Sequence, residues 1–235
     1  MDKLKKKYRD FWQDRQARRR MFISLALLFG ALIINYFAAL YAFERASNPV
    51  SDIILSNFPA LDVDWVFVWG PIIFWLIITI RLLKEPKQIA FTIKSVALFV
   101  VIRSIFISLT HIGPFPDHTT LDTFGASLLS GGVNGHSPFF FVFSSGADLF
   151  FSAHTGLPFL LALIFWPYRE FKTFCLASSG FFGVVVLLGH LHYSIDVASA
   201  FFITYTIHHL ATRFFKEDLQ DFAAAGKPSY TQLPS

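Results

Sequence analysis

Cysteine and charge are both scarce in this chain of 235 residues. Cys175 is the only cysteine, so the chain can form neither an internal disulfide nor a zinc site built on cysteines. Charged residues make up 15% of the chain and hydrophobic residues 54%, whereas a soluble domain carries about 25% charged residues. One soluble core cannot bury so much apolar surface, and the same composition excludes disorder, a coiled coil and collagen. The composition therefore predicts a membrane protein.

Six stretches are apolar and long enough to cross a bilayer, because a membrane-spanning helix needs about 20 residues. We expect these helices at residues 21–43, 63–83, 90–112, 149–166, 173–191 and 193–215. The first apolar run is too long for a secretory signal and is followed by no small-x-small cleavage site. The predicted fold class is therefore all-α, a polytopic membrane protein with six transmembrane helices.

Lysine and arginine are absent from residues 113–148, whereas nine of them lie in residues 1–20. With the N-terminus inside, 18 of the 20 basic residues fall on the cytoplasmic side, leaving Arg45 outside and Arg103 within the third helix. Basic residues flank the cytoplasmic ends of membrane helices, so we expect both termini in the cytoplasm.

This topology divides the chain into three parts. Residues 1–20 form a basic cytoplasmic segment that anchors the topology beside anionic headgroups, residues 21–215 form the six-helix catalytic domain, and residues 216–235 form a cytoplasmic tail expected to be disordered. The basic segment carries no nucleic-acid-binding motif.

Ionisable side chains at membrane depth are rare and mark functional sites. Five of them are expected just beneath the outer surface: Arg103, Asp148, His154, His192 and Asp196. His192 and Asp196 are four residues apart and would share one face of a helix, where the carboxylate would fix the imidazole tautomer. Two histidines and a guanidinium at one depth suit phosphoryl transfer, with one imidazole attacking phosphorus and the other protonating the leaving oxygen. A structural polar pair, or a zinc site that includes His190, is the alternative.

At these residues the chain resembles the sphingomyelin synthase-related lipid phosphotransferases, which are relatives of the type-2 phosphatidic acid phosphatases. GADLFFSAHT (146–155) is similar to the third motif of that family, and GHLHYSIDV (189–197) to its fourth. PVSD (49–52), and Arg103 with Thr110 and Pro114, are weaker matches to the first and second motifs. Leu191 and Ala153 stand where many members have an acid and a glycine, which leaves the headgroup open.

The resemblance implies a role for each polar group. His192 would attack the phosphorus and carry a transient phospho-headgroup, Asp196 would orient His192, and His154 would protonate the departing lipid oxygen. We expect four further side chains to contact the substrate: Arg103, Asp148, His190 and Tyr193.

The expected activity is transfer of a phospho-headgroup from a glycerophospholipid to ceramide or a related lipid alcohol such as diacylglycerol, without a metal ion or a cofactor. A lipid phosphatase or phospholipase C-type hydrolase would use the same residues with water as the acceptor. A non-catalytic scaffold or lipid transporter would use them as polar contacts between helices.

The remaining expectations concern partners and location. No nucleic-acid partner is expected, and the headgroup and the oligomeric state stay open. The compact loops favour a bacterial inner membrane over a Golgi or plasma membrane, with the active site on the extracytoplasmic side.

Overall fold

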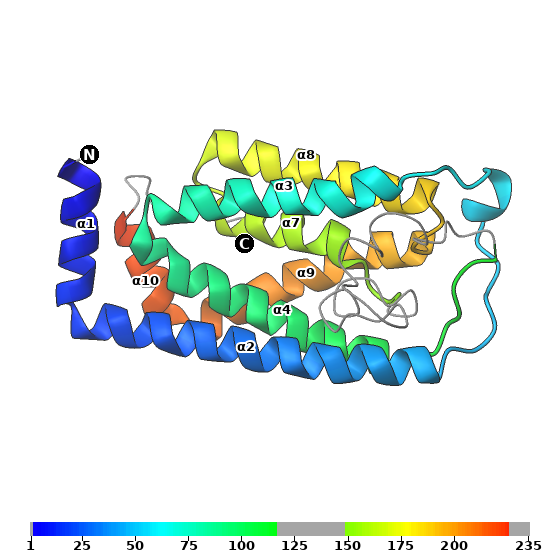
Figure 1. Ribbon diagram of the computed structural model, residues 1–235, viewed down its shortest axis with the longest axis horizontal. Coiled ribbons are helices and arrows are strands. Elements are labelled where there is room, and N and C mark those ends of the chain that lie inside the picture. The colour runs from blue at the N-terminus through cyan, green and yellow to red at the C-terminus, as the bar shows by residue number, and fades with distance from the viewer. Residues whose placement is uncertain (1, 117–148, 226–235) are drawn as a thin grey trace, which may run out of the picture.

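The computed structural model describes residues 2–116 and 149–225, which form helices and no strand. The α-helices are α1 (Asp2–Gln13), α2 (Arg15–Glu44), α3 (Asp64–Leu83), α4 (Ile89–Leu109), α7 (Ala153–Ile164), α8 (Arg169–Leu188), α9 (Ser194–Phe214) and α10 (Lys216–Ala225). Two 3₁₀ turns, η1 (Leu55–Asn57) and η2 (Pro86–Gln88), lie before α3 and before α4. In Figure 1 the long helices run along one axis, and α1 stands across one end of the bundle.

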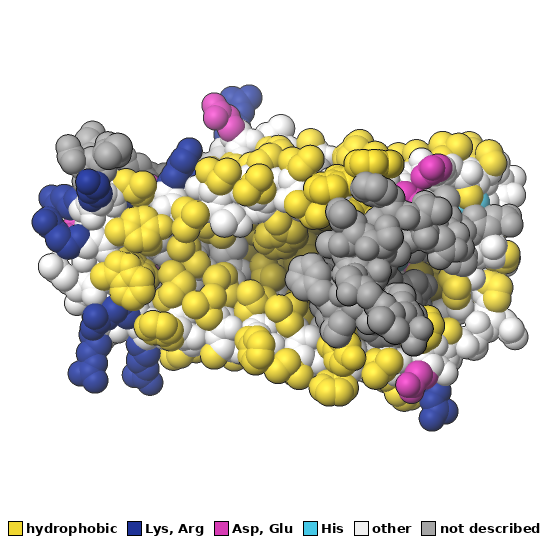
Figure 2. Space-filling model, in the orientation of Figure 1, with side chains coloured by type: hydrophobic (Ala, Val, Ile, Leu, Met, Phe, Trp, Pro, Cys, Tyr) yellow, Lys and Arg dark blue, Asp and Glu magenta, His cyan; other side chains and the backbone are white. Residues whose placement is uncertain are grey.

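Four of the described helices are long and apolar enough to cross a membrane: α2, α3, α4 together with η2, and α8. On helix α2, 62% of Phe22, 68% of Phe29 and 62% of Phe37 is exposed. Exposing these rings to water would be unfavourable, whereas contact with lipid is not. Hydrophobic side chains cover the middle of the molecule in Figure 2, and lysine and arginine gather at the α1 end. The protein is therefore a helical membrane protein.

The other two predicted spans also form helices, with differences. Helix α7 has 12 residues, about 18 Å, so it is too short to cross the roughly 30 Å of hydrocarbon by itself. It begins late because Ser152 caps it, its Oγ accepting the Thr155 backbone N–H at 3.4 Å. Helix α9 has 21 residues but is not among the four apolar helices.

Small residues let the helices approach closely. Ala38 and Ala39 of α2 pack against Ile107 of α4, as small residues do in membrane helix interfaces. At Gly156 of α7, an added Cβ would lie 2.8 Å from the Phe99 ring and 2.9 Å from Thr204 Oγ1. Helices α4, α7 and α9 therefore meet at Gly156, and this contact holds the start of α7 in place.

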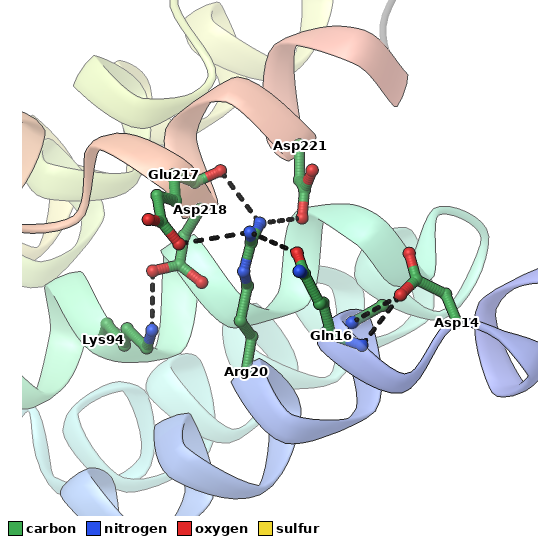
Figure 3. Close-up of polar contacts among 8 residues, drawn as sticks. Asp14, Gln16, Arg20, Lys94, Glu217, Asp218 and Asp221 are labelled. Carbon is green, nitrogen blue, oxygen red and sulfur yellow. Dashed lines mark hydrogen bonds and ion pairs between the residues drawn. The ribbon is translucent and has the colours of Figure 1, made fainter.

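The tail contains a helix where disorder was expected. Residues 216–225 form α10, and residues 226–235 lie outside the described part of the chain. Phe222 is fully buried in the core beside Phe91 and Phe165. Asp218 accepts a hydrogen bond at 2.6 Å from Lys94 of α4, with both side chains buried (Figure 3). The expectation for residues 216–225 was wrong because it rested on polar composition, whereas one apolar ring and one ion pair dock this helix.

Candidate active site

The candidate site lies at the end of the bundle opposite α1, where the α8–α9 connection meets the start of α7 (Figure 1). Helix α8 ends at Leu188, and His190 follows with a φ of 54°, in the left-handed region that stops a helix. Tyr193 caps α9, and its backbone N–H donates to Asp196 Oδ2 at 2.9 Å. Because Asp196 closes the first turn in this way, α9 cannot extend back to His192. The expectation that His192 and Asp196 share one helix was therefore wrong.

The two side chains nevertheless lie together. His192 Nδ1 lies 3.5 Å from Asp196 Oδ2 and 2.9 Å from the carbonyl oxygen of Leu149. Since a carbonyl only accepts, Nδ1 must donate, and in the neutral ring the lone pair then lies on Nε2. His192 and Asp196 are both buried, with 6% and 0% of their surface exposed. The contact with Leu149 therefore holds the neutral His192 ring in the tautomer that carries its proton on Nδ1.

His154 faces this imidazole from the first turn of α7. The centroids of the His154 and His192 rings are 6.4 Å apart, with their planes at 57°. Phe67 of α3 stacks on the His154 ring at 4.2 Å between centroids and 27° between planes. The backbone N–H of Ser152 donates to the carbonyl of Asp196 at 3.1 Å, which ties the start of α7 to the first turn of α9.

Arg103 of α4 brings a cation to the same place. Its side chain is buried, with 6% exposed, and its Nε donates to the carbonyl of Phe151 at 2.9 Å. The positive charge lies within electrostatic reach of His154. A guanidinium beside two imidazoles suits an anionic tetrahedral group, because its planar donors match phosphate oxygens.

Asp52, in the connection between α2 and α3, is a residue whose part the sequence did not predict. Its Oδ2 accepts from the backbone N–H and the Oγ of Ser194 at 2.7 and 2.8 Å, and its Oδ1 accepts from the N–H groups of Ile54 and Leu55 at 2.8 and 3.1 Å. Burial by itself would raise the pKa of Asp52, but the hydrogen bonds from Ser194, Leu55 and Ile54 lower it below 3.8. The carboxylate therefore stays charged and holds the first residue of α9, two residues after His192. The PVSD resemblance was the only sequence signal for Asp52.

Tyr193 and His190 were expected to contact substrate. The Tyr193 hydroxyl donates to the carbonyl of Gly113 at 2.8 Å and accepts from the N–H of Val50 at 3.2 Å, and only 2% of the residue is exposed. The His190 ring packs edge-on against Phe115, and neither ring nitrogen bonds to the described part of the chain. The Tyr193 hydroxyl therefore connects the loop that follows α2 with the loop that follows α4. Asp148 lies outside the described residues.

Gly113 has a steric reason to lack a side chain. An added Cβ would lie 2.1 Å from the carbonyl oxygen of Ser47. Ser47 in turn donates its backbone N–H to the carbonyl of His111 at 2.8 Å. The ends of α2 and α4 are joined by these contacts, and Tyr193 joins them to the start of α9.

Among the described residues, no group of three or more histidine, cysteine, aspartate or glutamate side chains is arranged to hold a metal ion. The centre consists instead of two facing imidazoles, a carboxylate and a guanidinium at one end of a bundle of membrane helices. Such a centre, in a helical membrane protein, suits chemistry on a phosphate ester.

The family comparison agrees with this chemistry. Residues 146–213 match the family described as "PAP2 superfamily C-terminal", and the match includes His154, His192 and Asp196. It supports a relation to the type-2 phosphatidic acid phosphatase superfamily, whose members are phosphatases and phosphotransferases acting on phosphate esters. No curated protein and no solved structure matches the chain.

Proposed function

We propose that the protein is a lipid phosphotransferase of the sphingomyelin synthase type, which moves a phospho-headgroup from a glycerophospholipid to ceramide or a related lipid alcohol. The observation that carries the proposal is the 6.4 Å separation of the His154 and His192 rings. At this separation one tetrahedral phosphate can contact both rings at hydrogen-bond distance. A pair of imidazoles that merely filled space between helices would not need a neighbouring carboxylate and guanidinium.

The first half-reaction uses each histidine once. His192 Nε2 attacks the phosphorus of the donor lipid, a phosphorus–nitrogen bond forms, and the bond from phosphorus to the glycerol oxygen breaks. His154, protonated while the anionic phosphate of the bound donor lies beside it, gives its proton to that oxygen, and diacylglycerol leaves. Arg103 offsets the charge on the phosphoryl oxygens, and Asp196 stabilises the positive charge that the attack places on the imidazole of His192.

The second half-reaction reverses these roles. His154, now neutral, takes the proton from the hydroxyl of the acceptor, whose oxygen attacks the phosphorus and releases His192. Water at this stage would hydrolyse the intermediate, so transfer requires that water be excluded from the site.

The same residues support a second candidate, a lipid phosphatase or phospholipase C-type hydrolase in which water is the acceptor. The family match favours this candidate, because the superfamily takes its name from phosphatidic acid phosphatases.

We further propose the topology that the basic residues imply. The six predicted spans, with α7 and α9 completing the bundle, would place both termini in the cytoplasm and the candidate site on the extracytoplasmic side, in a bacterial inner membrane. Labelling a single introduced cysteine at exposed Ser51 from either side of sealed vesicles tests this, in a background where Cys175 is replaced by alanine. Access of Ser51→Cys from the cytoplasmic side would reject the topology.

The activity is tested with the purified full chain in vesicles that contain a donor labelled in its headgroup, with and without ceramide. Choline, ethanolamine and inositol donors are compared in parallel. The proposal expects label in a new lipid only when ceramide is present. Label found only in water-soluble products would reject transfer in favour of hydrolysis.

A matched pair of variants separates the enzyme from a scaffold. His192→Ala removes the proposed nucleophile, whereas His209→Ala removes an exposed histidine of α9. The enzyme proposal expects His192→Ala to be folded and inactive and His209→Ala to be active. If both variants are as active as the parent, His192 has no chemical role, and unfolding of His192→Ala would favour the scaffold.

A further inference from the structure

Helix α1 presents a basic surface at the end of the bundle opposite the candidate site. Lys5, Lys6 and Arg9 are exposed on it, together with Trp12, of which 49% is exposed. In Figure 2 lysine and arginine gather at this end of the molecule, next to the hydrophobic middle. The surface thus lies where apolar side chains give way to charge.

Contacts on the opposite side of α1 hold the helix in this position. Phe11 is buried, with 3% exposed, and the Tyr8 hydroxyl donates to the carbonyl of Leu83 at 2.9 Å. Lys7 forms an ion pair with Glu85. These contacts fasten α1 to the connection between α3 and α4, so the basic surface is a fixed part of the fold.

The start of α2 sets the orientation of α1 relative to the spanning helices. Asp14 separates the two helices and caps α2, its Oδ1 accepting from the N–H groups of Gln16 and Ala17 at 2.8 and 3.2 Å. Figure 1 shows α1 lying across the end of the bundle. In a bilayer, a helix that crosses the end of membrane spans in this way would lie along the surface, where tryptophan suits the level of the headgroups.

The protein itself pairs some of the cations at this end and leaves others exposed. Arg20 binds Glu217 and Asp221 of α10, and Lys94 binds Asp218, as Figure 3 shows. Lys5 and Lys6 form no ion pair within the described part of the chain. Arg9 forms a long, exposed ion pair at 3.9 Å with its sequence neighbour Asp10. Arg20 and Lys94 are therefore neutralised by the protein itself, whereas Lys5 and Lys6 are left for an external anion.

We propose that the exposed surface of α1 binds the headgroups of anionic phospholipids. The anionic surface of a bilayer complements its charge, each basic residue near such a surface contributes about 1 kcal/mol, and an exposed indole beside lysines suits the interface better than a soluble partner. This inference does not depend on the proposed chemistry, because the surface and the candidate site lie at opposite ends of the bundle.

The test uses the full chain in phosphatidylcholine vesicles that contain increasing phosphatidylglycerol. Bromine on the acyl chains of one lipid or the other quenches nearby tryptophan, and subtraction of the Trp12→Phe signal isolates Trp12. We expect brominated phosphatidylglycerol to quench Trp12 more strongly than brominated phosphatidylcholine at equal content. In Lys5→Gln/Lys6→Gln this preference falls about fivefold for each lysine removed.

The matched control is Arg213→Gln/Lys216→Gln, which removes two exposed cations of the same end but from α9 and α10. We expect it to keep the preference of the parent protein. Equal quenching by both lipids, an unchanged preference in Lys5→Gln/Lys6→Gln, or an equal loss in the control would each overturn the proposal. Displacement of the anionic lipid from Trp12 by an added RNA oligonucleotide would assign the surface to a soluble polyanion instead.

Discussion

Asp52 offers the sharpest test of how the loops hold the candidate site. Its carboxylate accepts four hydrogen bonds, two from Ser194 and one each from Ile54 and Leu55. Asp52→Asn keeps the shape but removes the charge and turns one acceptor into a donor, so the two bonds from Ser194 and the two from Ile54 and Leu55 cannot all survive. Hydrogen bonds to a charged group contribute about 1.5–3 kcal/mol each. We expect a net destabilisation of about 2 kcal/mol, because the new amide regains part of the loss.

The buried cysteine supplies the assay. Cys175 is the only cysteine and is fully buried, so a thiol-reactive dye in detergent reports unfolding as that thiol becomes accessible. A loss of 2 kcal/mol lowers the midpoint by about 4–8 °C in a chain of this size. The control is Asp62→Asn. Within the described part of the chain, exposed Asp62 accepts only the N–H of Asp64 at 3.1 Å, and asparagine caps about as well as aspartate. An Asp52→Asn midpoint within 1 °C of the parent would refute the reasoning.

The pH dependence has a definite sign. The pKa of Asp52 is lowered in the folded protein, so its stabilisation is fully present above the unfolded pKa, 3.8, and is lost as the pH falls through the folded pKa. Circular dichroism melts should therefore show a constant difference between the parent and Asp52→Asn above about pH 5 and a shrinking difference below pH 3.8. A difference that grows on acidification would contradict the assignment.

Three further predictions follow from single contacts. Phe67→Leu removes the ring stacked on His154 and should lower the transfer rate in the vesicle assay more than it lowers the thermal midpoint, whereas Phe67→Tyr should retain the rate. Gly113→Ala should destabilise the folded protein by about 1–3 kcal/mol, because the new Cβ would meet the carbonyl oxygen of Ser47. Gly30→Ala, where the Cβ would meet open space, should leave the stability unchanged. Equal thermal midpoints for the two variants would contradict this. Asp218→Asn should lower the stability by about 3–5 kcal/mol, because it leaves the buried ammonium of Lys94 unpaired. Adding Lys94→Met should recover most of this stability in the thiol assay. No recovery would show that the ion pair is not the cause of the loss.

Apolar length was enough to predict the membrane helices α2, α3, α4 and α8, and the ionisable residues indicated that His154 and His192 meet. The sequence could not show where α9 begins, because that depends on Asp196 accepting the N–H of Tyr193. Spacing alone made His192 and Asp196 look like one helical face, and the structure brings them together by a loop instead.

The two other differences have the same origin in long-range contacts. The sequence did not indicate the role of Asp52, because its partner, Ser194, is 142 residues away. Helix α10 looked like a tail because its polar sequence conceals the pairing of Asp218 with Lys94, 124 residues away. Local patterns contain no information on such pairs.

The central claim is that the two imidazoles act on one phosphorus, with His192 as the nucleophile. The most direct measurement is to mix the purified protein with a donor lipid labelled at phosphorus, quench within one turnover, and count acid-labile label on the chain. We predict label on the parent at residue 192, slower formation of the same label in His154→Ala, and no label in His192→Ala. Equal label in both variants, or label mapped to residue 154, would contradict the account.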